Sequence, residues 1–229
     1  MTTFLFDPPV PASVAIAGSD QRFPARRILC VGRNYAAHAR EMGMDPGREP
    51  PFFFFKPTDA LVDDGAQVKY PPLTADFQFE IELVVAIGTG GSNIDRSRAL
   101  SHVFGYTVGI DLTRRDLQLQ AREMGRPWDW GKGFDQAAPC APLRRVNDIG
   151  HPSVGRIWLA VNGVTKQDSD LSELIWPVPD IIALASQAMA LQPGDLIYTG
   201  TPAGVGPLVA GDVVTGGVDK VAEIRIQIV

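Results

Sequence analysis

Cysteine and histidine are scarce in this sequence, which has two cysteines and three histidines in 229 residues. Cys30 and Cys140 provide neither a disulfide framework nor a cysteine-rich zinc site, and they suit a reducing compartment. The first 11 residues lack the basic start and apolar stretch of a signal peptide, and no apolar run reaches the about 18 residues of a membrane span. We therefore expect a cytoplasmic protein with no membrane partner.

Clusters of positive charge are missing as well. No group of five or more Lys and Arg occurs and the net charge is −5, which argues against a nucleic-acid surface. The sequence contains no G-x-S-x-G nucleophile motif and no Walker A motif. These absences leave a small molecule as the expected partner and argue against covalent serine catalysis.

Proline and glycine are plentiful, with 19 and 23 residues that separate short β-rich runs. This pattern predicts an α+β fold of mostly β type. Strands are expected at 27–31, 52–55, 80–87, 103–110, 156–161, 196–199 and 221–229, and short helices at 34–42, 112–124 and 178–190. Because no linker divides the chain, we expect one catalytic domain over 1–229, with an N-terminal lead-in at 1–25.

Two glutamates, Glu80 and Glu82, interrupt the apolar run of residues 77–87. Because side chains alternate along a strand, the two carboxylates share one face, roughly 7 Å apart. Two partly buried carboxylates this close repel, so the pattern asks for a metal ion or a shared proton. An edge strand with one wet face accounts for the same residues, and the pattern alone leaves both explanations open.

Asp111 stands where an apolar strand ends and an amphipathic helix begins. Taken alone, it is typical of a helix N-cap. Taken with Glu80 and Glu82, it completes a set of three hard oxygen ligands without a nearby Cys or His, which suits Mg²⁺ or Mn²⁺ better than zinc. Three carboxylates on an octahedral ion leave positions for a chelating substrate and a water.

Five segments in the right order resemble the fumarylacetoacetate hydrolase family: 28–35 with His38, 53–57, 80–82, Asp111 and 200–206. The stretches GIDLTRRDLQ (109–118) and WDWGKGFDQAAP (128–139) are most similar to its fumarylpyruvate hydrolase and acylpyruvase branch. The resemblance implies a mixed β-sandwich roll of the family's C-terminal domain type with a few short helices. It also implies a homodimer and a divalent ion held by Glu80, Glu82 and Asp111. Ile110 and Arg114 replace the family's usual Asn and Ala, which affects the expected substrate rather than the metal.

His38 and Glu41 lie three residues apart in a short expected helix and so share a helix face. A carboxylate beside an imidazole orients one ring nitrogen and leaves the other to take a proton from water. Spacing alone favours an incidental surface ion pair, whereas the resemblance implies a catalytic His–Glu pair. We expect residues 34–50 to form a lid that orders when ligand binds, because the helix is Ala-rich. His102 and His151 are expected in loops.

A dicarboxylic substrate at this site requires compensating cations. Lys132 lies between two glycines, and Arg115 and Gln118 follow Asp111 by four and seven residues on one helix face. These positions match the substrate-binding residues of the family, and we expect Arg114 on the surface. Further candidates for substrate binding are Thr201 in the glycine-rich loop 200–206, Arg33, Tyr106 and Lys56.

The expected activity is metal-dependent hydrolysis of a carbon–carbon bond in a 2,4-dioxo acid, with fumarylpyruvate giving fumarate and pyruvate as the best candidate. In this scheme His38, held by Glu41, deprotonates the attacking water, and Lys132 stabilises the leaving enolate. Decarboxylation of oxaloacetate or isomerisation of 2-hydroxyhepta-2,4-diene-1,7-dioate would use the same metal without an attacking water. A non-catalytic protein that binds metal and a dicarboxylate is the second alternative.

Overall fold

An eight-stranded mixed sheet forms the centre of the computed structural model, which describes residues 3–42 and 51–229. Its strands, in spatial order, are β4 (Phe52–Lys56), β3 (Arg27–Gly32), β15 (Asp195–Tyr198), β8 (Ile81–Ile87), β9 (Val103–Ile110), β11 (Ala138–Cys140) and β5 (Leu61–Asp63), with β12 (Arg144–Arg145) also beside β9. All seven residues of β8 are buried. Its continuous apolar run therefore reflects cover on both faces rather than one wet face.

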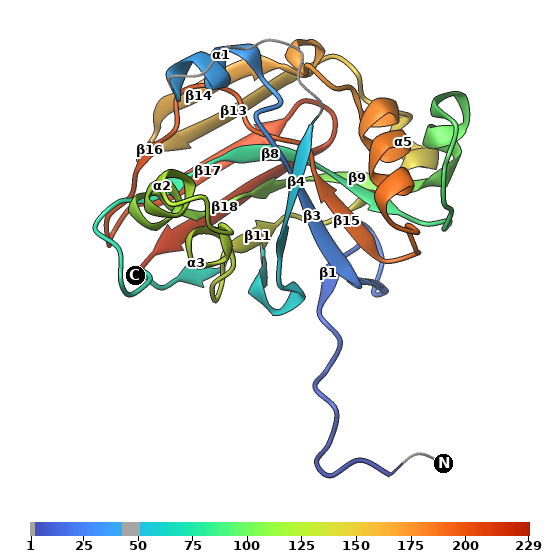
Figure 1. Cartoon of the computed structure of the whole chain (residues 1–229), viewed down its shortest axis with the longest axis horizontal. Helices are drawn as coiled ribbons and strands as arrows, with labels where there is room; N and C mark the ends of the chain where they lie inside the picture. Colours follow the sequence, from blue (N-terminus) through green and yellow to red (C-terminus); the bar gives the residue numbers. More distant parts are fainter. Residues whose placement is uncertain (1–2, 43–50) are drawn as a thin grey trace.

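A five-stranded sheet packs against the eight-stranded one and closes the core. Its order is β14 (Val164–Asp170), β13 (Arg156–Val161), β17 (Val213–Val218), β18 (Ala222–Ile228) and β6 (Gln67–Val68). Strands β13, β17 and β18 contact β8 and β9 across the interface. Figure 1 shows the two sheets curling around each other. The predicted mostly β fold, a mixed sandwich of two packed sheets, is confirmed.

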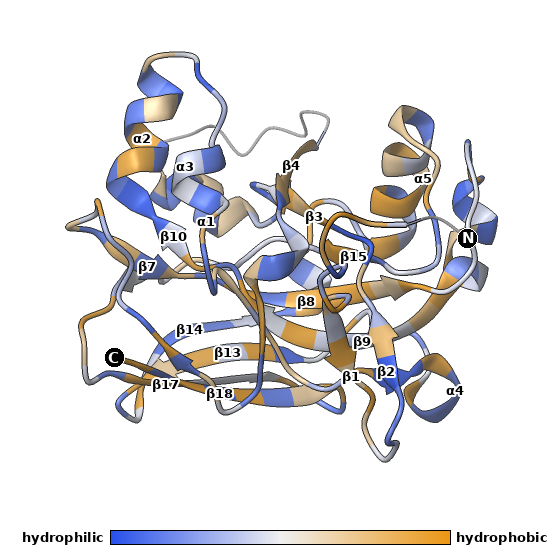
Figure 2. Ribbon diagram, turned by 90° about the horizontal axis from the view of Figure 1, so that it is seen from below, coloured by the Kyte–Doolittle hydropathy of each residue, from blue (hydrophilic) through white to orange (hydrophobic). Residues whose placement is uncertain are grey.

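Two small sheets and a few short helices complete the fold. The small sheets are β1 (Ser13–Ala15) with β2 (Arg22–Pro24), and β10 (Thr113–Arg114) with β7 (Phe77–Phe79) and β16 (Gly206–Pro207). The α-helices are α1 (Ala36–Glu41), α2 (Arg115–Glu123), α3 (Asp129–Lys132), α4 (Val146–Ile149) and α5 (Val178–Ala188), and the 3-10 helices are η1 (Thr58–Ala60), η2 (Arg96–His102) and η3 (Leu171–Glu173). In Figure 2, α1, α2, α3 and α5 lie on the side of β8 and β9 opposite β13 and β17.

Two sequence expectations need correction at element boundaries. The helix expected at 112–124 begins at Arg115, because residues 113 and 114 pair with β7 as β10. The segment 1–25 is not merely a lead-in, since β1 and β2 pair within it, while residues 3–11 extend away from the body (Figure 1). None of the helices in the described ranges has the length and apolar character needed to cross a bilayer.

Candidate functional site

Three carboxylates meet where β8 and β9 run side by side. Glu82 lies opposite Gly109 in the ladder, and the Asp111 amide, just beyond β9, donates to the Glu80 carbonyl at 2.8 Å. One carboxylate oxygen from each of Glu80, Glu82 and Asp111 lies within 4.8 Å of the others. All three residues are at most 5% exposed. The antiparallel pairing therefore brings together the carboxylates that the sequence separates by about thirty positions.

The alternatives left open for these residues are wrong. β8 lies between β15 and β9, so it is not an edge strand with a wet face. Ile81, between the two glutamates, points to the opposite sheet, where a Cβ on Gly216 would come within 2.8 Å of it. Asp111 is not a helix cap either, because the N-cap residue of α2 is Arg114.

Lysine side chains neutralise two of the carboxylates. Lys132 Nζ donates to Glu80 Oε2 at 2.8 Å, to Asp111 Oδ2 at 2.7 Å and to Thr113 Oγ1 at 2.7 Å. Lys56 Nζ lies 2.9 Å from Asp111 Oδ1. Both lysines are at most 2% exposed. Because their charges are as deeply buried as the carboxylates, each would be costly without its partner.

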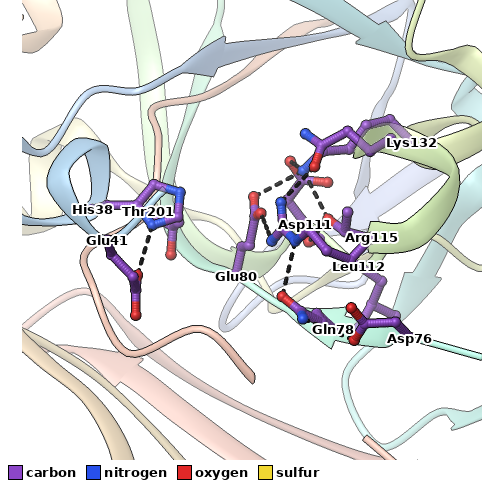
Figure 3. Close-up of polar contacts among 12 residues, drawn as sticks. His38, Glu41, Asp76, Gln78, Glu80, Asp111, Leu112, Arg115, Lys132 and Thr201 are labelled. Atoms are coloured by element: carbon purple, nitrogen blue, oxygen red, sulfur yellow. Dashed lines mark hydrogen bonds and ion pairs between the residues drawn. The ribbon is translucent and has the colours of Figure 1, made fainter. Parts of the chain in front are cut away.

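Arg115 links the first turn of α2 to one of these carboxylates, Glu80. Its Nη2 donates to Glu80 Oε1, its Nη1 to Gln118 Oε1 at 2.5 Å and its Nε to Gln78 Oε1 at 2.8 Å. Figure 3 shows Glu80 between this cationic group and the His38–Glu41 pair. The two amide side chains fix the orientation of the guanidinium, since each accepts one of its hydrogen bonds.

The cations separate the pKa values of the two glutamates. Burial alone would raise the pKa of Glu80, but the charges of Lys132 and Arg115 hold it well below its ordinary value. Burial raises the pKa of Glu82 well above its ordinary value, and the charges of Asp111 and Glu80 raise it further. Burial would lower the pKa of Lys132, but Asp111 and Glu80 raise it. Glu82 is therefore the carboxylate whose negative charge is least compensated.

The donor set fits a hard divalent cation. Glu82 makes no ion pair with any residue in the described ranges, and its Oε2 accepts only from the Gly200 amide at 2.7 Å. Asp111 Oδ1 is buried and accepts no hydrogen bond, so Lys56 contacts it as an ion pair alone. Three clustered carboxylates with unused oxygen lone pairs are the ligands that Mg²⁺ or Mn²⁺ prefers.

His38 and Glu41 lie on α1, across the cavity from the cations. His38 is 7% exposed and lines the same cavity as Glu80, Glu82 and Lys132. Its Nδ1 lies 3.0 Å from Glu41 Oε2. Since a carboxylate can only accept, Nδ1 carries the proton and Nε2 is left as the acceptor in the neutral ring. The Gly204 amide donates to Glu41 Oε1 at 2.9 Å, which links α1 to the glycine-rich loop.

The start of the expected lid is anchored. Asn34 Nδ2 donates to the carbonyls of Trp176 at 2.9 Å and Thr199 at 2.8 Å, and its Oδ1 accepts from the Trp176 amide at 2.7 Å. The part of the expected lid from 43 to 50 lies outside the described residues. Ordering of the segment on ligand binding therefore stays a prediction.

The other predicted substrate-binding residues divide into two groups. Arg33, Gln118 and Thr201 line the cavity with His38 and the glutamates. Tyr106 does not, because it lies on the opposite face of β9, where its hydroxyl is 2.7 Å from His151 Nδ1. Its assignment to the site is therefore corrected.

Arg114 is buried, so the expectation that it lies on the surface is wrong. It is 8% exposed, and its guanidinium stacks 4.4 Å above the centre of the Phe134 ring. Arg114 lines a hollow separate from the carboxylate cavity, together with Phe134 and Lys69. The residue that departs from the family's usual Ala therefore does not enter the cavity.

Sequence reasoning missed several residues that shape the site. Gln167 Nε2 donates to Thr201 Oγ1 at 2.7 Å, and its Oε1 accepts from the Ile81 amide at 3.0 Å, so it joins the glycine-rich loop to β8. Nothing in the polar sequence of β14 marks Gln167. Arg122 also lines the cavity, and its spacing of seven residues from Arg115 could have indicated it. The remaining cavity wall is formed by Val31, Gly32, Met42, Phe54, Leu119 and Trp128.

Comparison with known proteins gives consistent matches over nearly the whole chain. The family model described as fumarylacetoacetate (FAA) hydrolase C-terminal matches residues 27–229. The chain is 46% identical to a fumarylpyruvate hydrolase from Ralstonia sp over 185 residues, which cover 81% of this chain and 96% of the relative. It is 39% identical to a mitochondrial oxaloacetate decarboxylase from Dictyostelium discoideum over 197 residues, 84% of this chain and 88% of the relative.

A solved structure supports the same relationship. The crystal structure of fumarylpyruvate hydrolase from Pseudomonas aeruginosa in complex with Mn²⁺ and pyruvate superposes with a TM-score of 0.98 at 51% identity. The match covers 99% of both chains. The arrangement of sheets and helices described above is therefore that of an enzyme solved with a divalent ion.

Proposed function

Because this chain belongs to the fumarylacetoacetate hydrolase family, we propose that it is a metal-dependent hydrolase that cleaves fumarylpyruvate to fumarate and pyruvate. The observation that carries the proposal is the placement of His38, which contacts Glu41, in one cavity with Glu80 and Glu82. A protein that only bound metal and a dicarboxylate would have no use for an imidazole oriented by a carboxylate at this position.

Glu80, Glu82 and Asp111 would hold the divalent ion, Mg²⁺ or Mn²⁺. When bound, such an ion supplies Lewis acidity toward the oxygens of the 2-oxo acid end of the substrate. The relative from Pseudomonas aeruginosa, solved with Mn²⁺ and pyruvate, supports this choice of ion and of substrate end. Glu80 is kept ionised by Lys132 and Arg115, so it is ready to act as a ligand at neutral pH.

His38 acts as the general base. Its Nδ1 proton is held by Glu41, so Nε2 can take a proton from a water in the cavity. The hydroxide oxygen attacks the C4 carbonyl, the C3–C4 bond breaks, and its electron pair leaves with pyruvate as the enolate. A proton then returns to C3, and the acyl part departs as fumarate. Glu41 is itself oriented by the Gly204 amide, so the base is held from two elements.

Lys132 and Arg115 stabilise the negative charge that develops on the pyruvate part. Both are buried against the carboxylate group, and so their charges act in a water-poor environment. Gln118, which accepts from Arg115 at 2.5 Å, still has its amide N–H groups to offer the substrate. Thr201, held by Gln167, lies at the glycine-rich side of the cavity, where it can hydrogen-bond the substrate.

The test is hydrolysis of fumarylpyruvate and decarboxylation of oxaloacetate by four proteins: wild type, His38→Gln, Glu82→Gln and the control His102→Gln. His102 is hydrogen-bonded to the Thr89 carbonyl, outside the cavity. Loss of fumarylpyruvate cleavage in both site variants, with full activity in the control, is expected. Wild-type levels of cleavage in His38→Gln would overturn the base assignment.

Oxaloacetate decarboxylation is the second candidate, because a relative from Dictyostelium discoideum with that name is 39% identical. That reaction needs the metal and Lys132 but no attacking water. It therefore predicts CO₂ release from oxaloacetate that survives His38→Gln and is lost in Glu82→Gln.

The proposal also includes that the protein is a cytoplasmic homodimer and that it acts in the catabolism of aromatic compounds. Size-exclusion chromatography with light scattering tests the dimer.

A further inference from the structure

Helix α2 presents a row of side chains along the cavity. Arg115, Gln118, Leu119 and Arg122 all line it, at the spacing of three and four residues that repeats on one helix face. Arg115 lies at the carboxylate end, in contact with Glu80. Seven residues of helix advance about 10 Å, so Arg122 marks a second cationic position at the outer end of the same row.

The two arginines differ in whether their guanidinium groups already have hydrogen-bond partners. Each donating nitrogen of Arg115 has an acceptor in Glu80, Gln118 or Gln78. Arg122 is exposed at the rim, and its side chain makes no hydrogen bond or ion pair with any residue in the described ranges. Since helical side chains lean toward the N-terminus, the Arg122 guanidinium is directed back toward Gln118 and the inner part of the cavity.

Aromatic side chains form the wall between the two ends. Phe54 and Trp128 line the cavity, with ring centroids 5.6 Å apart. Flat aromatic ring faces suit a planar unsaturated acyl chain, but they carry no positive charge to pair with a carboxylate. A carboxylate at the far end of such a chain therefore finds a cationic partner only beyond the aromatic wall.

The dimensions of the proposed substrate match this layout. A seven-carbon dioxo acid with a carboxylate at each end is on the order of 7 Å long at standard bond lengths. With its 2-oxo acid end at Glu80 and Arg115, its other carboxylate lies within the reach of an arginine side chain that leans back from about 10 Å along the helix. A guanidinium matches a carboxylate with two parallel hydrogen bonds.

We propose that Arg122 binds the terminal carboxylate of the acyl group and so makes the enzyme selective for acylpyruvates with an acidic tail. This inference rests on the proposed hydrolase function. Arg122 is far from the bond that breaks, so its contribution is to substrate binding and selectivity rather than to the chemical step.

The test compares kcat and KM for fumarylpyruvate, which has an acidic tail, and acetylpyruvate, which has none. Arg122→Gln keeps the length of the side chain but removes its charge. It should lower kcat/KM for fumarylpyruvate on the order of 10- to 100-fold, mainly through KM, and leave acetylpyruvate within about twofold. Arg122→Lys should fall between the two, because lysine keeps the charge without the paired hydrogen bonds.

Arg126→Gln is the matched control, since Arg126 is exposed four residues further on and does not line the cavity. Equal losses on both substrates in Arg122→Gln, or no loss on fumarylpyruvate, would overturn the inference. A loss of fumarylpyruvate cleavage that occurs in Arg33→Asn and not in Arg122→Gln would also overturn the inference. Asn is chosen because it tolerates the positive φ of 59° at residue 33. If wild type cleaves both substrates equally well, the inference fails and the proposed function stands; if it cleaves neither, the proposed function fails.

Discussion

Lys132 is the side chain whose removal most directly tests the electrostatic design of the site. Lys132 is 1% exposed, and its ammonium group contacts Glu80, Asp111 and Thr113 at 2.7–2.8 Å. Lys132→Met keeps most of the volume but leaves two buried carboxylates without their shared cation. Breaking a buried pair in this way costs about 3–5 kcal/mol, which corresponds to a fall of roughly 6–20 °C in Tm for a domain of this size.

The assay is urea and thermal unfolding of the metal-free protein, with Lys166→Met as control. Lys166 is exposed on β14, so its replacement should change the free energy of unfolding by less than about 0.5 kcal/mol. Adding Glu80→Gln to Lys132→Met should recover part of the loss, because one uncompensated charge is removed. Mn²⁺ should stabilise Lys132→Met more than wild type, since the variant site is more negative. A loss below about 1 kcal/mol in Lys132→Met would refute the reasoning.

The remaining predictions concern three single residues, Glu82, Gln167 and Tyr106. Because the pKa of Glu82 is raised, the folded, metal-free protein keeps a proton there to a higher pH than the unfolded chain does, so its stability should fall as pH rises above the ordinary value of 4.5. Mn²⁺ binding displaces that proton, so calorimetry should show affinity rising by up to about tenfold per pH unit, and a flat profile would contradict this. Gln167→Leu should cost about 1–3 kcal/mol in urea unfolding, because the Ile81 amide and Thr201 lose a buried partner, and an unchanged midpoint would count against it. Tyr106→Phe should leave kcat/KM unchanged, since the hydroxyl contacts His151 outside the cavity; a tenfold drop would return Tyr106 to the site.

Much of the fold follows from local patterns along the chain. β9 and β13 coincide with the expected ranges, because each is a buried apolar run bounded by turn residues. β14 is not among the expected strands. It has a polar sequence with most side chains exposed, and so it lacks the apolar alternation that marks a strand in sequence.

The charged residues of the site could be predicted from the sequence, whereas the amide side chains that hold them in place could not. Glu80 and Glu82 can be recognised in the sequence because a charge inside an apolar strand is costly to bury. Gln78 and Gln167 do not, since an amide side chain is equally common on a solvated surface. Their roles arise only when the fold brings residues 34 or more positions apart into contact, as between Gln78 and Arg115 at 2.8 Å and Gln167 and Thr201 at 2.7 Å.

Cleavage of fumarylpyruvate in ¹⁸O-labelled water tests the central claim most directly. If His38 activates a water that attacks the C4 carbonyl, mass spectrometry after a short reaction with Mn²⁺ should find fumarate that carries one solvent oxygen. The His38→Gln variant should give no labelled fumarate above the uncatalysed rate. Release of CO₂ in place of fumarate, or fumarate and pyruvate formed without solvent oxygen in the fumarate, would contradict the account.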